Sequence, residues 1–185
     1  RPHIPGLLST TDTAMSQGLI PATILTGFLG SGKTTLLKRV LSENHGKKIA
    51  VIENEFGEEN IDNEILVDTQ EQIIQLSNGC VCCTIREDLR STLATLAEKR
   101  RKGELDFERV VIETTGLADP GPVAQTFFMD DEIAESYLLD SILTLVDAKH
   151  GDAQLDTRQE ARRQIGFADQ IFISKTDLVD AETVE

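Results

Sequence analysis

The chain has 185 residues, of which 39% are hydrophobic and 27% are charged, and its formal net charge at pH 7 is −14. This length and composition fit one globular domain with a sizeable core. The negative charge argues against a nucleic-acid surface or an anionic membrane as partner, because both attract clustered Lys and Arg. No apolar run approaches the ~20 residues that a membrane span needs, and residues 1–15 lack the apolar segment of a signal peptide. We therefore expect a cytoplasmic protein with no nucleic-acid and no membrane partner.

Two domain boundaries are expected from the ends of the chain. Residues 1–14 precede Met15 and are expected to be an extension that is disordered or was added in cloning. Residues 15–185 are expected to form the one folded domain. Because the chain stops at Glu185 directly after a motif and without a closing element, we expect this domain to be C-terminally truncated.

Short β-branched apolar runs alternate with helical patterns along the chain. Strands are predicted over residues 22–26, 49–52, 73–76, 110–112, 142–146 and 171–173. Helices are predicted over residues 33–43, 85–102 and 152–165, and Pro120 and Pro122 are expected to lie in the loop after the strand over residues 110–112. In the second helix, apolar residues recur at i, i+4, i+8 and i+11, and the basic run 99–102 falls in the last turn, where cations favour the helix dipole. The alternation predicts an α/β fold with a mostly parallel sheet and helices on both faces.

The first motif is Gly27-Phe-Leu-Gly-Ser-Gly-Lys-Thr34, which fits the G-x-x-x-x-G-K-[ST] pattern of a phosphate-binding loop (P-loop). It stands between a predicted strand and a predicted helix, as the pattern requires. Its glycines let successive N–H groups point at phosphate oxygens, Lys33 can reach the β- and γ-phosphates, and the Thr34 hydroxyl can bind Mg²⁺. We therefore predict a P-loop NTPase fold. The expected nucleotide-binding residues here are Gly27, Gly30, Ser31, Gly32, Lys33, Thr34 and Thr35.

Ser174-Lys-Thr-Asp177 follows the last predicted strand and resembles the N-K-x-D element of P-loop GTPases. There the Asp carboxylate accepts two hydrogen bonds from guanine, and the Lys stem packs along the base. Adenine presents the wrong donors, which would leave a buried carboxylate unpaired. Ser174 replaces the usual Asn, so it can tie this loop to the P-loop only with a shorter reach. Ser174, Lys175 and Asp177 are the expected guanine-side residues, and an ordinary turn is the alternative.

Glu113-Thr-Thr-Gly116 ends the strand predicted over residues 110–112. An acidic residue at the tip of the strand beside the P-loop orients Mg²⁺ in P-loop proteins, and a following Gly lets the chain pass the γ-phosphate. We therefore expect Glu113 to act at Mg²⁺ together with Thr34. Gly116 is expected to sense the γ-phosphate through its N–H group. The expected catalytic residues are Lys33, Glu113 and Gly116.

All three cysteines lie in Gly79-Cys-Val-Cys-Cys83. An odd number of clustered thiols argues against a disulfide framework and favours a metal site or redox chemistry. Thiolates prefer Zn²⁺ or Cu(I) over hard cations, and three of them leave one tetrahedral position for another ligand. The alternative is three buried cysteines without a ligand. Because the segment follows one predicted strand by a turn and precedes a helix, we expect it at the carboxyl edge of the sheet.

The fourth metal ligand is expected from His45 or from the acidic stretch of residues 53–68. That stretch holds seven carboxylates and no Lys or Arg. We name Glu55 as the candidate fourth zinc ligand.

Together, the P-loop motif, Glu53-Asn-Glu-Phe-Gly-Glu58, the C-x-C-C motif, Glu113-Thr-Thr-Gly116 and Ser174-Lys-Thr-Asp177 resemble the CobW family of metal-handling GTPases. The resemblance covers about residues 20–178. It implies that GTP and Mg²⁺ bind at the P-loop and that Cys80, Cys82 and Cys83 carry the metal. It also implies that the Glu-rich segment acts as a switch, with Glu53, Glu55 and Glu58 as switch residues. It also implies a second, C-terminal domain in the family.

We therefore predict a GTP-binding and GTP-hydrolysing metal chaperone that transfers zinc, with cobalt or nickel as the alternative metals, to a client protein or a cofactor pathway. Its expected cofactors are GTP or GDP, Mg²⁺ and Zn²⁺. No clear arginine finger follows from the sequence, so slow intrinsic hydrolysis is expected. A homo-oligomer is compatible with the sequence. Three alternatives stay open: a non-enzymatic thiol or metal sensor with structural nucleotide, a P-loop small-molecule kinase, and a structural zinc knuckle.

Overall fold

A computed structural model describes residues 18–54, 73–75, 77, 79–85 and 88–184. Seven strands form one sheet in the order β3-β4-β2-β5-β1-β6-β7. Six of them run parallel, and β3 pairs antiparallel with β4 at one edge. The predicted α/β fold with a mostly parallel sheet is confirmed. The strands are β1 (Ile20–Gly27), β2 (Ile49–Asn54), β3 (Ile73–Gln75), β4 (Val81–Ile85), β5 (Arg109–Glu113), β6 (Tyr137–Asp147) and β7 (Gln170–Ser174).

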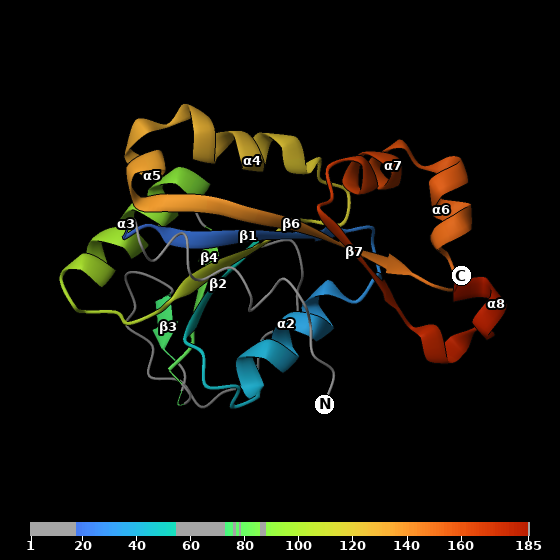
Figure 1. Cartoon of the computed structure of the whole chain (residues 1–185), viewed down its shortest axis with the longest axis horizontal. Helices are drawn as coiled ribbons and strands as arrows, with labels where there is room; N and C mark the ends of the chain where they lie inside the picture. The colour runs from blue at the N-terminus through green and yellow to red at the C-terminus, as the bar shows by residue number, and fades with distance from the viewer. Residues whose placement is uncertain (1–17, 55–72, 76, 78, 86–87, 185) are drawn as a thin grey trace.

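Helices cover both faces of this sheet, as predicted (Figure 1). On one face the core contains Ile24, Ile52 and Ile112 and packs against α3 (Leu89–Arg101), α4 (Pro120–Met129) and α5 (Asp131–Ser136), with α7 (Gln159–Gly166) beside them. On the other face Val51 and Val111 pack against α2 (Lys33–Ser42). The remaining helical segments are α6 (Gly151–Thr157), the single turn η1 (Thr176–Leu178) and α8 (Ala181–Val184). None of the helices among the described residues is long and apolar enough to cross a membrane.

Three element predictions were wrong. The segment Val81–Ile85 is a strand of the sheet, so Ile85 belongs to β4 and the following helix begins at Leu89, after Asp88 accepts a hydrogen bond from the Ser91 N–H group at 2.6 Å. The strand was missed because the apolar spacing that starts at Ile85 also fits a helix.

The loop expected around Pro120 and Pro122 is the helix α4. Pro is tolerated in the first turn of a helix, where its missing N–H group has no intrahelical partner, and Asp119 accepts from the Gly121 N–H group at 2.9 Å. The single helix predicted over 152–165 is two helices, α6 and α7, which meet at the extended Arg158. Arg162 donates to the carbonyls of Leu155 and Asp156 at 3.0 and 3.3 Å, which satisfies the last turn of α6.

Parallel strands end at the same edge of the sheet, and this edge collects the predicted polar residues. Pairing places Leu25 opposite Glu113 and Asp147 opposite Ser174. Glu53, on β2, pairs with Thr84 on β4. The end of β1, which leads into the P-loop, therefore has β5 on one side and β6 on the other.

Candidate functional site at the carboxyl edge of the sheet

The P-loop connects β1 to α2, and the side chain of Lys33 folds back onto the loop. The Lys33 ammonium group donates to the carbonyl oxygens of Gly27 at 2.7 Å and Phe28 at 3.3 Å. Burial lowers the pKa of Lys33, and the nearby Glu113 carboxylate partly opposes this shift. The lysine is therefore held inside the loop, where its charge can meet a phosphate group.

Two glycines let the chain segments at this edge come close. A β-carbon on Gly27 would lie 2.5 Å from the carbonyl oxygen of Leu145. A β-carbon on Gly116 would lie 2.8 Å from the backbone nitrogen of Leu29 in the P-loop. The loop after β5 thus lies directly against the P-loop, as the motif Glu113-Thr-Thr-Gly116 predicts, and any side chain at Gly116 would push the two apart.

Thr34 and Glu113 meet at the start of α2. The Thr34 hydroxyl donates to Glu113 Oε1 at 3.2 Å. Burial raises the pKa of Glu113, as does the Glu53 carboxylate, whereas Lys33 and the Thr34 hydroxyl lower it. Hydroxyl and carboxylate oxygens are the ligands that Mg²⁺ prefers, so this pair fits the predicted magnesium site. Thr35 is exposed on the same helix.

The loop after β7 is tied to the P-loop by the serine that replaces the usual asparagine. Ser174 Oγ donates to the carbonyl oxygen of Ser31 at 2.6 Å. Lys175 has a positive φ of 57°, and its ammonium group donates to Asp147 Oδ2 at 2.7 Å. Asp177 follows in η1 with an exposed side chain. The short reach of Ser174 is sufficient to join the loop after β7 to the P-loop.

Asp147, at the end of β6, is a residue of this site that the sequence reasoning missed. Its carboxylate accepts from Lys175 and from the backbone N–H groups of Lys149 and His150, and His150 Nδ1 lies 3.1 Å from Oδ2. Burial alone would raise the pKa of Asp147, but the hydrogen bonds from Lys175, His150 and Lys149 lower it to about 2. An Asp directly after a predicted strand was the only available signal.

The three cysteines do not point to one side of the sheet. Cys80 and Cys82 belong to the core against α2, whereas Cys83 belongs to the core on the opposite face. Cys80 Sγ donates to the Lys47 carbonyl oxygen at 3.6 Å. Cys82 and Cys83 lie in the first half of β4, opposite Val51 and Ile52 of β2. The expected place of this motif, after a strand and at the carboxyl edge, was wrong: β3 runs antiparallel to β4, so the chain enters β4 at the opposite edge of the sheet. Neighbouring strand residues also face opposite sides of the sheet.

The thiols of Cys82 and Cys83 are held in the protonated form. Burial raises the pKa of Cys82 to about 12, with further contributions from Glu53 and Glu113. Burial also raises the pKa of Cys83, with contributions from Cys82 and Glu53. Both thiols therefore favour the neutral state at pH 7 in this conformation.

Glu53 lies between the phosphate side and the cysteines. Its Oε1 atom is buried and has no hydrogen-bond partner among the described residues. Burial raises the pKa of Glu53, which Lys38 partly lowers, and its charge acts on Glu113 and on both adjacent cysteines. Such an orphaned carboxylate oxygen suits a cation.

The structure gives less support to the other candidates for a fourth metal ligand. Glu55 and Glu58 lie outside the described residues. His45 has both ring nitrogens engaged, with Nε2 at 2.8 Å from the Val40 carbonyl oxygen and Nδ1 accepting from the Lys47 N–H group at 3.1 Å. Within the described ranges, no three His, Cys, Asp or Glu side chains are grouped closely enough to hold a metal ion.

Comparisons with known proteins identify the family to which this sequence is similar. Residues 21–185 match the family model of the CobW/HypB/UreG nucleotide-binding domain. The zinc chaperone YjiA of Escherichia coli is 50% identical over 159 residues, which are 86% of this chain and 50% of that protein. The zinc-regulated GTPase metalloprotein activator 1 of Schizosaccharomyces pombe is 41% identical over 172 residues, which are 89% of this chain and 41% of that protein.

A solved structure agrees in fold as well as in sequence. The zinc-bound YjiA GTPase from E. coli superimposes with a TM-score of 0.77 at 49% identity, over 90% of this chain and 52% of that one. This chain thus spans about half the length of the relatives that it matches. By its P-loop, its Glu-x-x-Gly loop and the match over residues 21–185, the chain belongs to the CobW/HypB/UreG family and carries its nucleotide-binding domain.

Proposed function

We propose that this chain is the GTP-binding and GTP-hydrolysing part of a zinc chaperone, in which the nucleotide controls a thiolate metal site. The observation that carries the proposal is the position of Glu53. Its charge acts on Glu113 at the phosphate side and on Cys82 and Cys83 at the thiol side. A carboxylate in this place can respond to the nucleotide and to a metal ion.

On the phosphate side, the groups that would act on the nucleotide already lie close together. Lys33 neutralises charge on the β- and γ-phosphates, and Thr34 with Glu113 would hold Mg²⁺. Bound there, Mg²⁺ would neutralise charge that develops on the phosphate oxygens. Gly116 offers its N–H group to the γ-phosphate, and Lys175 and Asp177 select guanine. Glu53 and Glu58 act as switch residues, and with no identified arginine finger we expect slow intrinsic hydrolysis.

The zinc ion is the cargo of the proposed reaction. We assign it to Cys80, Cys82 and Cys83. The fourth ligand is Glu53, whose charge acts on both Cys82 and Cys83, or Glu55 as the alternative. Because Cys82 and Cys83 face opposite sides of β4, zinc binding requires this strand to change conformation. Cobalt and nickel are the alternative metals.

The names of the relatives support this assignment. Two relatives are called zinc chaperone and zinc-regulated GTPase metalloprotein activator. By analogy, the whole protein passes zinc to a client protein or cofactor pathway in the cytoplasm, and a homo-oligomer is compatible with the proposal. Nothing in the described residues favours the kinase, sensor or zinc-knuckle alternatives.

The test is a zinc titration of the reduced, metal-free chain with Mg²⁺ and either GDP or a non-hydrolysable GTP analogue. We expect zinc affinity to differ between the two nucleotide states and to be lost in Cys82→Ala. Equal affinity in both states would refute the coupling, because a ligand shifts an equilibrium only if it discriminates between its states. Parallel titrations with ATP check the guanine assignment and the kinase alternative.

A further inference from the structure

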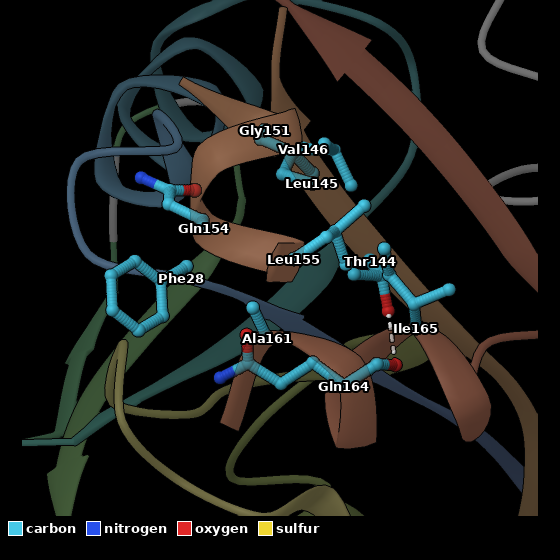
Figure 2. A pocket seen from close by; sticks show the side chains of 10 residues that line it. All are labelled: Phe28, Thr144, Leu145, Val146, Gly151, Gln154, Leu155, Ala161, Gln164 and Ile165. Carbon is cyan, nitrogen blue, oxygen red and sulfur yellow. Dashed lines mark hydrogen bonds between the residues drawn. The ribbon is translucent and has the colours of Figure 1, made fainter. Parts of the chain in front are cut away.

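Gln164, on α7, is a buried residue that the proposed chemistry does not use. Its side chain is 1% exposed and extends from α7 toward Phe28 of the P-loop, beside a small cavity (Figure 2). About 10 Å³ of this cavity is open to a water-sized sphere, which is too little for a small-molecule ligand. The cavity itself is therefore no substrate site, and the question is what the buried amide does.

Both donor contacts of this amide go to the loop that follows Glu113. Gln164 Nε2 donates to the carbonyl oxygens of Gly116 and Ala118, each at 3.1 Å. Gln164 Oε1 is buried and has no partner among the described residues. Among the described residues, every side-chain hydrogen bond of Gln164 therefore goes to this loop, and the two would separate only at the cost of both bonds.

The backbone of α7 is fixed at the same residue. The Thr144 hydroxyl of β6 donates to the backbone carbonyl of Gln164 at 2.9 Å, as Figure 2 shows. Gln164 is thus anchored to the sheet through its main chain, and it holds the Gly116–Ala118 loop through its side chain. Gly116 in turn packs on Leu29 of the P-loop.

The contact between Gln164 and the Gly116 carbonyl also fixes the direction of the next N–H group in the chain. The bond between Gly116 and Leu117 is trans, so the N–H group of Leu117 points opposite to the Gly116 carbonyl oxygen. Because Gln164 holds that oxygen, the N–H group points away from α7. This fixed donor follows directly after the Gly116 N–H group that the proposed function assigns to the γ-phosphate, and it would need no reorientation to meet a phosphate oxygen there.

We propose that Gln164 is a positioning residue that holds the Gly116–Ala118 loop against the P-loop and so favours nucleotides that carry a γ-phosphate. This inference rests on the proposed GTPase function. GDP lacks the γ-phosphate that would meet this loop, so its affinity would not depend on how the loop is oriented. Gln164 therefore acts on the discrimination between GTP and GDP rather than on guanine nucleotide binding as such.

The test compares Gln164→Met with Gln154→Met. Methionine has nearly the shape of glutamine but no amide donors. Gln154 lines the same cavity, and among the described residues its side chain makes no hydrogen bond that the structure shows, so its substitution is the matched control. We expect Gln164→Met to weaken the affinity for a fluorescent GTP analogue about tenfold and that for GDP less than about twofold. Gln154→Met should leave both affinities unchanged.

An unchanged ratio of the two affinities in a folded Gln164→Met chain would overturn the inference and leave the proposed function intact. A wild-type chain that binds neither guanine nucleotide would overturn both. A second measurement needs no variant: amide NMR of the wild-type chain with GDP and with the GTP analogue. We expect the Gln164 side-chain amide and the Leu117 N–H resonance to shift between the two states, and identical positions for both would also overturn the inference.

Discussion

The phosphate side, at the end of β1, and the thiol side, on β4, are separated by β2 and β5 and are prepared to different degrees. On the phosphate side, Lys33 is bonded to two carbonyls of the P-loop, and Thr34 contacts Glu113. On the thiol side, Cys82 and Cys83 face opposite sides of β4, and burial raises the pKa of both thiols.

This difference shows what each ligand must do. A nucleotide meets a site whose groups already converge, so little reorganisation is needed. At the proposed site, a zinc ion would have to draw thiols from both faces of a strand and displace their protons. The groups of the nucleotide site are thus already in place, whereas the proposed metal site would have to be assembled.

The largest effect is expected at the phosphate side. Lys33→Ala removes the cation that meets the β- and γ-phosphates, and we expect GTP hydrolysis to fall by roughly 100-fold or more. Phosphate release measured at saturating GTP gives the rate. Arg39→Ala is the control, since Arg39 lies on the same helix and makes an exposed ion pair with Glu43. Hydrolysis by Lys33→Ala within a few fold of wild type would contradict the assigned role.

On the thiol side, Cys82→Ser is expected to lower zinc affinity by roughly 100-fold, because a four-ligand zinc site is worth about 10–16 kcal/mol in total. Competition with a zinc indicator dye measures the affinity. The two variants control each other: Cys82→Ser should still bind GDP, and Lys33→Ala should still bind zinc. If either substitution abolished both activities, the two sides of the site would not be separable as we describe them.

A smaller effect is expected where the guanine loop meets the P-loop. Ser174→Ala removes the bond to the Ser31 carbonyl, and a hydrogen bond of this kind contributes about 1 kcal/mol, so we expect GDP to bind about fivefold more weakly. Ser42→Ala is the control, since that hydroxyl bonds within α2. Unchanged GDP affinity in Ser174→Ala, measured by fluorescent-nucleotide titration, would show that the tie does not support binding.

The phosphate side could be predicted from the sequence because its signals are local. The P-loop is one contiguous motif, and its spacing alone places Lys33 and Thr34. Ser174 stands where asparagine is usual, and its shorter side chain still donates a 2.6 Å hydrogen bond to the Ser31 carbonyl oxygen. The parallel sheet also followed, because alternating strands and helices leave few other topologies.

The thiol side and the buried amide could not be predicted in the same way. Whether Val81–Ile85 forms a strand is decided by pairing with β2, and strand preference depends on such distant neighbours. Gln164 contacts Gly116 and Ala118, 48 and 46 residues earlier in the chain. Asp147 acquires its role only when β6 and β7 bring Lys175 to it, 28 residues later. A single sequence holds no local sign of such contacts.

The smallest effect concerns Asp147, which fixes Lys175 on the formed side of the site. The pKa of Asp147 is lowered to about 2, from 3.8 for a free Asp side chain, so its charge stabilises the fold at pH values above about 4. This contribution is lost as pH falls through 4 toward 2. Asp147→Asn should therefore lower the free energy of unfolding by about 1 kcal/mol at pH 7.

The difference between wild type and Asp147→Asn should persist at pH 5 and shrink as pH falls further toward 2, because wild-type Asp147 then becomes neutral like asparagine. Urea unfolding at several pH values measures it, with the exposed Asp156→Asn as the control. A difference that stays constant down to pH 2 would mean that the shape of Asp147, rather than its charge, holds Lys175. In that case packing around Asp147, rather than its charge, would hold the loop after β7 in its formed position.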